Sequence, residues 1–225
     1  MHILHLIKTS EGAGWALNLI KELKEQFPQL SFSVAIPLGG KHTEEYRNLC
    51  KNVYEFEYKI TTSIFKRGKY LHEIVKNDKP DIIHSWFAQT TLYARLFLRK
   101  FNIPRIFQVV GPLHLENRLF KWGDIRSAGN NDYWIATSKY IYDKYRQQRV
   151  DDKYLFLNYA YVDVLKLLEY RKQIVTLDLK DKLKIPTHYK IIGTASFIYP
   201  PKLLKKTGVK GHEHLLHSFK NVLNK

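Results

Sequence analysis

The chain has 225 residues, of which 44% are hydrophobic and 14% aromatic, and its formal net charge is +16. This length and apolar content can bury a globular core and argue against a disordered chain. No apolar run approaches the roughly 18–20 residues needed to span a bilayer, and the first residues carry no secretory pattern, so we expect a cytoplasmic protein.

The positive charge is unevenly distributed along the chain. Residues 1–62 hold seven Lys and Arg against seven Asp and Glu, residues 63–150 sixteen against seven, and residues 151–225 fourteen against seven. Such an excess attracts anionic lipid, phosphorylated substrates or nucleic acid. Because no nucleic-acid-binding motif is present, we expect an anionic membrane surface or an anionic substrate, and no specific nucleic acid.

Apolar segments alternate with amphipathic helical segments from the N-terminus onward. The expected strands are 2–7, 32–38, 53–58, 81–85, 105–110, 133–136 and 153–158. The expected helices are 16–26, 44–51, 65–76, 90–101 and 139–147, and residues 113–131 form an irregular or partly helical insert. Ser138 is suited to cap the last of these helices. Repeated βα units predict an α/β fold, a doubly wound parallel sheet of Rossmann-like type.

After Asp163 the pattern changes to a charged helical linker, 165–183, followed by a strand, 189–193, and a helix after Gly211. We expect two domains, 1–163 and 164–225, the second being only the start of another α/β domain. One strand and one helix cannot form an independent core.

The loop between this strand and helix is a candidate anion site. A backbone turn with free N–H groups at a helix start favours phosphate, and Lys202 and Lys210 supply positive charge. A solvated connecting loop is the alternative.

These features together resemble the retaining nucleotide-sugar glycosyltransferases of family 4, which have the GT-B fold. The segments that carry the resemblance are 11–14 (EGAG), 81–85 (DIIHS), 108–116 (QVVGPLHLE), 135–138 (IATS), 162–163 (VD), 193 and 210–213 (KGHE). The likeness covers nearly the whole chain, and the segment 111–116 looks like the bacterial surface-polysaccharide branch.

The resemblance implies a sugar transfer from a nucleoside-diphosphate sugar to a glycan or lipid-linked oligosaccharide, at the inner face of the cell membrane, with no cofactor and no metal. It gives His114 a catalytic position near the reacting sugar. It implies substrate contacts for five further residues: Gly12, Ala13, Gly14, His84 and Glu116. Lys202 and Lys210 would neutralise the leaving diphosphate. A structural histidine remains the alternative for both His114 and His84.

Some positions depart from the family pattern. Phe197 stands where relatives commonly have arginine, Trp86 where many have a second histidine, and Tyr161 where glycine is usual. The glutamates that hold the donor in relatives would lie beyond Lys225. We therefore expect this chain to be inactive alone, and its sequence does not identify the donor sugar or nucleotide. The rival functions are a nucleotide-sugar epimerase of the same fold and a non-enzymatic module that binds membranes or nucleic acid.

Overall fold

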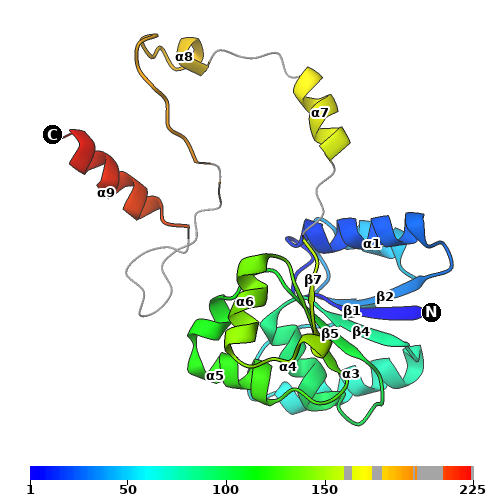
Figure 1. Cartoon of the computed structure of the whole chain (residues 1–225). Helices are drawn as coiled ribbons and strands as arrows, with labels where there is room; N and C mark the ends of the chain where they lie inside the picture. Colours follow the sequence, from blue (N-terminus) through cyan, green and yellow to red (C-terminus); the bar gives the residue numbers. More distant parts are fainter. Residues whose placement is uncertain (160–163, 174–178, 195, 197–209, 224–225) are drawn as a thin grey trace. The chain divides into compact units, whose positions relative to one another are not determined.

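The computed structural model describes residues 1–159, 164–173, 179–194, 196 and 210–223. The chain divides into two compact units, Met1–Asp163 and Val164–Lys225. Figure 1 shows the elements of both units.

Unit 1 is built on a seven-stranded sheet in the order β3-β2-β1-β4-β5-β6-β7. The strands are β1 (His2–Leu6), β2 (Ser31–Ile36), β3 (Asn52–Glu55), β4 (Ile82–Ser85), β5 (Arg105–Val109), β6 (Asp132–Ala136) and β7 (Leu155–Leu157). Every neighbouring pair is parallel. The predicted doubly wound parallel sheet is confirmed.

The helical elements of unit 1 follow the strands as expected. They are α1 (Gly14–Gln26), α2 (Thr43–Leu49), α3 (Ile64–Asp78), α4 (Ala88–Phe97), η1 (Leu113–Glu116), α5 (Arg118–Lys121), η2 (Trp122–Arg126), α6 (Lys139–Gln147) and η3 (Asp152–Tyr154). The Ser138 hydroxyl accepts a hydrogen bond from the Ile141 amide, which confirms the predicted cap of α6. Strands β3 and β7, at the two edges of the sheet, are shorter than predicted.

The two faces of the sheet are covered by different helices, as Figure 1 shows. Helices α1 and α2 pack against β1 and β2 through the cluster that contains Leu17 and Phe32. Helices α3 and α4 pack on the other face around Leu71 and Tyr93, and α6 packs against β5 and β6. Burial on both faces explains why the strands are almost continuously apolar.

Unit 2 contains three described helices: α7 (Val164–Gln173), α8 (Leu179–Lys182) and α9 (His212–Leu223). The helices predicted in the linker and after Gly211 are present, but the predicted strand 189–193 is wrong, since these residues have no regular structure. A strand needs a hydrogen-bonding neighbour, and the described part of unit 2 offers none. The assignment of this unit to a donor-binding domain stays a prediction. Across the described residues, no helix is both long and apolar enough to cross a membrane.

Candidate functional site

The loops that could form a site leave the carboxyl ends of β1, β4 and β5. Parallel strands place all of these ends at one edge of the sheet. The chain turns from β1 to α1 on one face and from β4 to α4 on the other. The neighbouring strands β1 and β4 therefore form the topological switch point, where doubly wound sheets bind their ligands.

The turn after β1 holds three predicted site residues, Gly12, Ala13 and Gly14. Ala13 has φ 61° and precedes α1 without a side-chain cap, so the first amides of this 13-residue helix are not covered by a side chain. A Cβ built at either glycine would make only ordinary contacts, whereas one built at Gly40, in the adjoining loop, would lie 2.3 Å from the Glu11 nitrogen. Of these three glycines, only Gly40 is required by a close approach of the neighbouring backbone.

His84 lies beneath aromatic side chains at the switch point. Its ring stacks on Trp86 at 4.6 Å between centroids, and Trp86 in turn packs 5.0 Å from Trp15, which is 37% exposed. Burial lowers the pKa of His84 to about 4, so the imidazole is neutral at physiological pH. Its Nε2 atom has no hydrogen-bond partner among the described residues. The structure places His84 in the interior, and contact with a substrate stays a prediction.

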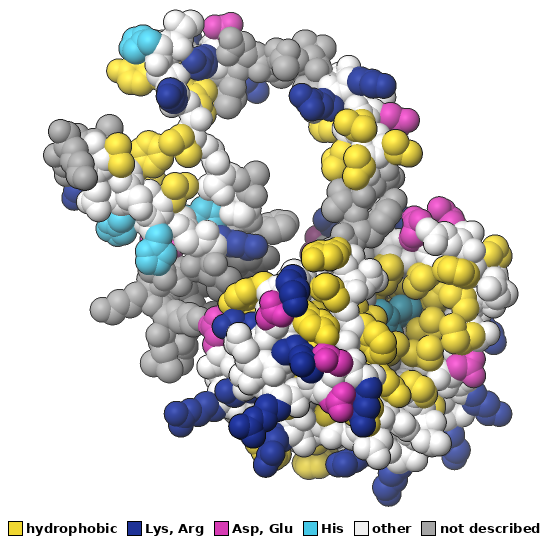
Figure 2. All heavy atoms as spheres, viewed as in Figure 1, with side chains coloured by type: hydrophobic (Ala, Val, Ile, Leu, Met, Phe, Trp, Pro, Cys, Tyr) yellow, Lys and Arg dark blue, Asp and Glu magenta, His cyan; other side chains and the backbone are white. Residues whose placement is uncertain are grey.

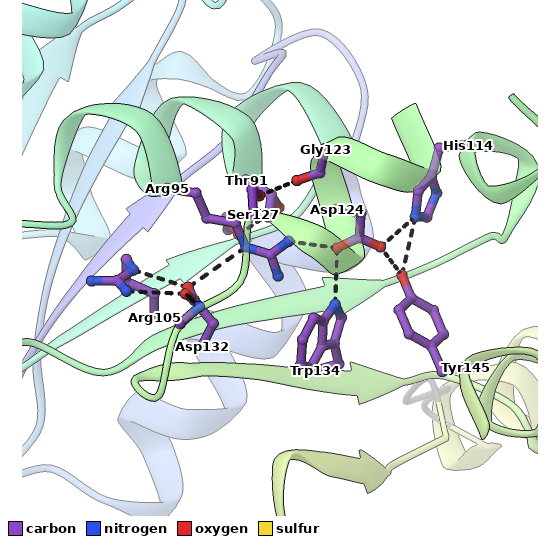
Figure 3. A network of polar contacts seen from close by, with 12 residues as sticks. Thr91, Arg95, Arg105, His114, Gly123, Asp124, Ser127, Asp132, Trp134 and Tyr145 are labelled. Atoms are coloured by element: carbon purple, nitrogen blue, oxygen red, sulfur yellow. Dashed lines mark hydrogen bonds and ion pairs between the residues drawn. The ribbon is translucent and has the colours of Figure 1, made fainter. Parts of the chain in front are cut away.

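His114, on η1, is held by two groups from other elements. Its Nε2 atom lies 2.9 Å from Oδ2 of Asp124 on η2 and 3.0 Å from the hydroxyl of Tyr145 on α6. Figure 3 shows the three side chains converging. The His114 side chain is 10% exposed, and its Nδ1 atom forms no hydrogen bond within the described part of the chain.

The partners of His114 determine which ring nitrogen carries the proton. Burial and the Asp124 carboxylate raise the pKa of Tyr145 far above its usual range, so its hydroxyl stays protonated and donates to Asp124 over 2.6 Å. Burial alone would raise the pKa of Asp124, but the hydrogen bond from His114 and the Arg95 charge outweigh it, and the pKa is lowered. Both neighbours can therefore accept from Nε2–H, which leaves Nδ1 as the ring nitrogen without a partner in the described part of the chain.

The same carboxylate belongs to a larger buried network, drawn in Figure 3. Oδ1 of Asp124 accepts from Arg95 Nη1 and from Trp134 Nε1, both at 2.9 Å. Arg105 forms a bidentate pair with Asp132 at 2.9 and 3.0 Å, and Arg95 Nε lies 3.6 Å from the same carboxylate. The network therefore ties η1 and η2 to α4, β6 and α6.

The remaining predicted site residues lie at the surface or outside the described residues. Glu116 is exposed at the end of η1. Lys210 is exposed just before α9, and the following Gly211 has φ 70°, which fits the predicted turn. Lys202 lies outside the described residues. Among the described residues, no cluster of three His, Cys, Asp or Glu side chains could hold a metal ion.

Comparison with protein families identifies the chain. Residues 15–163 match the model of Glycosyltransferase Family 4, which is most of the sheet and both helical layers of unit 1. The chain belongs to glycosyltransferase family 4. No curated protein matches it.

Solved structures similar to this family 4 chain share its fold. Anabaena HepE in complex with UDP-glucose has a TM-score of 0.55 at 16% identity and covers 77% of this chain and 49% of HepE. A glycosyltransferase from Rickettsia africae has a TM-score of 0.56 and 14% sequence identity. The match covers 83% of this chain and 50% of the Rickettsia protein. UDP-GlcNAc 2-epimerase from Neisseria meningitidis, bound to UDP-GlcNAc, has a TM-score of 0.54 and 17% sequence identity. The match covers 83% of this chain and 54% of the epimerase. The chain spans about half the length of these proteins.

In this family 4 chain the turn with Gly12 and the segment with His114 lie at the same sheet edge. They follow β1 and β5, which are separated by β4 alone, so the strands that carry them are roughly 10 Å apart. The sequence pointed to neither Asp124 nor Tyr145, because they lie 10 and 31 residues from His114 and share no motif with it.

Proposed function

We propose that the chain provides the acceptor side of a retaining GT-B glycosyltransferase, which transfers a sugar from a nucleoside-diphosphate sugar to a growing cell-surface polysaccharide. The observation that carries the proposal is the family 4 match over residues 15–163. The topological switch point between β1 and β4 supports it, since doubly wound sheets bind their ligands at such points. HepE has been solved in complex with UDP and with UDP-glucose, which is why a nucleotide sugar is proposed as the donor.

In this proposal His114 acts beside the reacting sugar, with its Nδ1 lone pair accepting a hydrogen bond or a proton from a substrate hydroxyl. The backbone around Gly12, Ala13 and Gly14 approaches the ligand at the uncapped start of α1. His84 and Glu116 contribute substrate contacts. Lys202 and Lys210 neutralise the departing diphosphate by charge alone.

The proposed acceptor is a lipid-linked glycan, and the enzyme works as a peripheral protein at the inner membrane face. The net charge of +16 supports this part of the proposal, because basic surfaces are attracted to anionic head groups.

The test is product analysis with a labelled UDP-sugar, using the chain and the longest protein that contains it. Transfer should require an added glycan or lipid-linked acceptor, and NMR of the product should show the anomeric configuration of the donor. An inverted product would refute the retaining mechanism. Conversion of the donor sugar without any acceptor would establish the rival function, that of an epimerase. The UDP-GlcNAc 2-epimerase from Neisseria meningitidis, which shares this fold, is the reason to test for it.

A further inference from the structure

A groove of about 470 Å³ lies between the first half of α3 and the end of α4, and none of the predicted site residues lines it. Apolar and basic side chains share its lining, among them Phe65, Lys69, Leu96, Phe97, Arg99 and Lys100. The helices approach closely here because residue 68 is glycine, and a Cβ at that position would lie 2.2 Å from the Phe97 ring. The groove is therefore a consequence of the packing of α3 against α4.

Two large apolar side chains stand out at this groove. Phe65 is 77% exposed and Leu96 is 59% exposed. Phe65 packs edge-on to Phe97, with 6.2 Å between ring centroids, and both rings line the groove. Leaving a phenylalanine and a leucine in water at one spot is unfavourable, and such patches commonly mark an interaction site.

Positive charge surrounds these apolar side chains. Lys66, Lys69, Arg99 and Lys100 are exposed, and within the described part of the chain none of the four forms an ion pair. Glu73 is the acidic residue in the lining. In Figure 2, Lys and Arg side chains gather along the lower side of unit 1, where Figure 1 places α3, α4 and α5.

We propose that the α3–α4 surface, defined by Phe65, Leu96 and the four cations around them, docks on an anionic membrane. The cations attract the head groups, and Phe65 and Leu96 enter the boundary between head groups and acyl chains. This surface deepens the membrane association proposed above and gives it a location.

The mixture of side chains favours a membrane over nucleic acid. Phosphate contacts would use the same cations, and Phe65 could stack on a base. Leu96 is aliphatic and offers no ring face for stacking, whereas a bilayer boundary accommodates both side chains. The cations would bind either a membrane or a nucleic acid, so the preference for a membrane rests on Phe65 and Leu96.

The first experiment measures sedimentation with mixed phosphatidylglycerol–phosphatidylcholine vesicles and with pure phosphatidylcholine vesicles. The chain should bind the mixed vesicles, and binding should weaken as salt shortens the Debye length from ~10 Å at 0.1 M to ~3 Å at 1 M. Lys69→Glu/Lys100→Glu should weaken binding by at least about tenfold. The matched control, Lys24→Glu/Lys51→Glu, makes the same change of net charge on the α1–α2 side and should have a much smaller effect. Equal losses in the two variants would overturn the proposal, because net charge alone would then explain binding.

The second experiment tests the apolar pair. Phe65→Ser/Leu96→Ser should also reduce vesicle binding about tenfold while leaving the circular dichroism and Tm unchanged, since both side chains are exposed. Phe27→Ser, which removes an exposed phenylalanine beside α1, is the control. Tighter binding of the unmodified chain to a single-stranded RNA than to the vesicles, with the Phe65 and Leu96 variants binding normally, would instead identify a nucleic-acid surface.

A fluorescent label at position 65 reports insertion directly. The single native cysteine, Cys50, is buried, and burial raises its pKa to about 12, so a maleimide should react selectively with the Phe65→Cys variant. An environment-sensitive label at position 65 should shift to the blue on mixed vesicles, and one at position 27 should not. Equal shifts at both positions would contradict the proposal. None of these measurements needs glycosyl transfer, so failure here leaves the proposed enzyme activity standing.

Discussion

At the scale of single residues, Asp124 holds together the polar interior around the candidate site. Its two oxygens accept from Arg95, Trp134, Tyr145 and His114, which come from four different elements. An ionised carboxylate is tolerated in the interior only when its lone pairs are satisfied in this way. The orientation of His114 therefore depends on a residue that itself has no contact with substrate in the proposed mechanism.

We predict that His114→Ala lowers turnover by at least about 100-fold, measured in the longest active protein that contains the chain, because the proposed proton acceptor is lost. The free energy of unfolding should fall by only about 1.5–3 kcal/mol, the value of one hydrogen bond to a charged group. Tyr145→Phe, which keeps the imidazole, should cost less activity. If folded His114→Ala protein turns over normally, the histidine is a structural residue.

Asp124→Asn should lower the free energy of unfolding by about 3–5 kcal/mol at pH 7, because it removes the charge opposite the buried Arg95. The pKa of Asp124 is lowered on folding, so its contribution is present above roughly pH 4 and disappears as the pH falls through the lower folded pKa. Urea denaturation should show the difference between variant and wild type shrinking in acid. Asp143→Asn breaks the exposed pair with Lys139 and should cost under about 1 kcal/mol. Equal effects of the two substitutions would contradict the importance of the network.

The free energy of unfolding should also depend on pH just below neutrality, through His84. Its folded pKa of about 4 lies below the unfolded value near 6.5, so the unfolded chain binds the proton first as the pH falls. Stability should be complete above pH 6.5 and should decrease by about 2 kcal/mol at pH 5 through this residue. Urea denaturation of His84→Gln should show a correspondingly flatter dependence between pH 7 and pH 5. Parallel curves for the two proteins would show that His84 is not buried as described.

At the scale of elements, the crossing of α3 and α4 depends on the absence of a side chain at Gly68. The Phe97 ring occupies the space where a Cβ would lie. Glycine lowers the intrinsic stability of a helix interior, so its presence in the middle of α3 is explained by packing rather than by propensity. The groove proposed to meet the membrane exists because of this contact.

Gly68→Ala should therefore destabilise the protein by about 1–2 kcal/mol, since overpacking outweighs the gain in helix propensity. Phe97→Leu should recover part of the loss in the double variant, which a double-mutant cycle measures. Gly111→Ala is the control, because a Cβ there meets no atom within 4 Å. A stabilised Gly68→Ala protein would mean that α3 and α4 pack less closely than described.

At the scale of the whole molecule, the chain has one α/β unit with a seven-stranded sheet and spans about half the length of the solved proteins that share its fold. A transferase that works in a crevice between two domains needs both walls to orient donor and acceptor. We predict that the purified 225-residue chain alone does not transfer or hydrolyse a nucleotide sugar at a measurable rate. Robust turnover by this chain would show that the site is complete in unit 1 or in an oligomer.

The sequence alone determined the architecture of unit 1. The alternation of buried strands with amphipathic helices is a local signal, and the parallel sheet and the Ser138 cap follow from it. The same local signal predicted a strand at residues 189–193, and this prediction was wrong. An apolar segment becomes a strand only when another strand is available to pair with it.

Only the tertiary structure decided the surroundings of the candidate residues. The sequence placed His114 in a loop after a strand, but the folded chain brings Asp124 and Tyr145 to its Nε2 atom and so selects the ring nitrogen that is left free. It also buried His84 against Trp86, in the strand β4 that pairs with β1. Contacts between residues far apart in sequence carry no periodic pattern, because they arise from where the sheet positions its loops. Periodicity therefore predicts elements, and the packing of those elements determines the chemistry of the site.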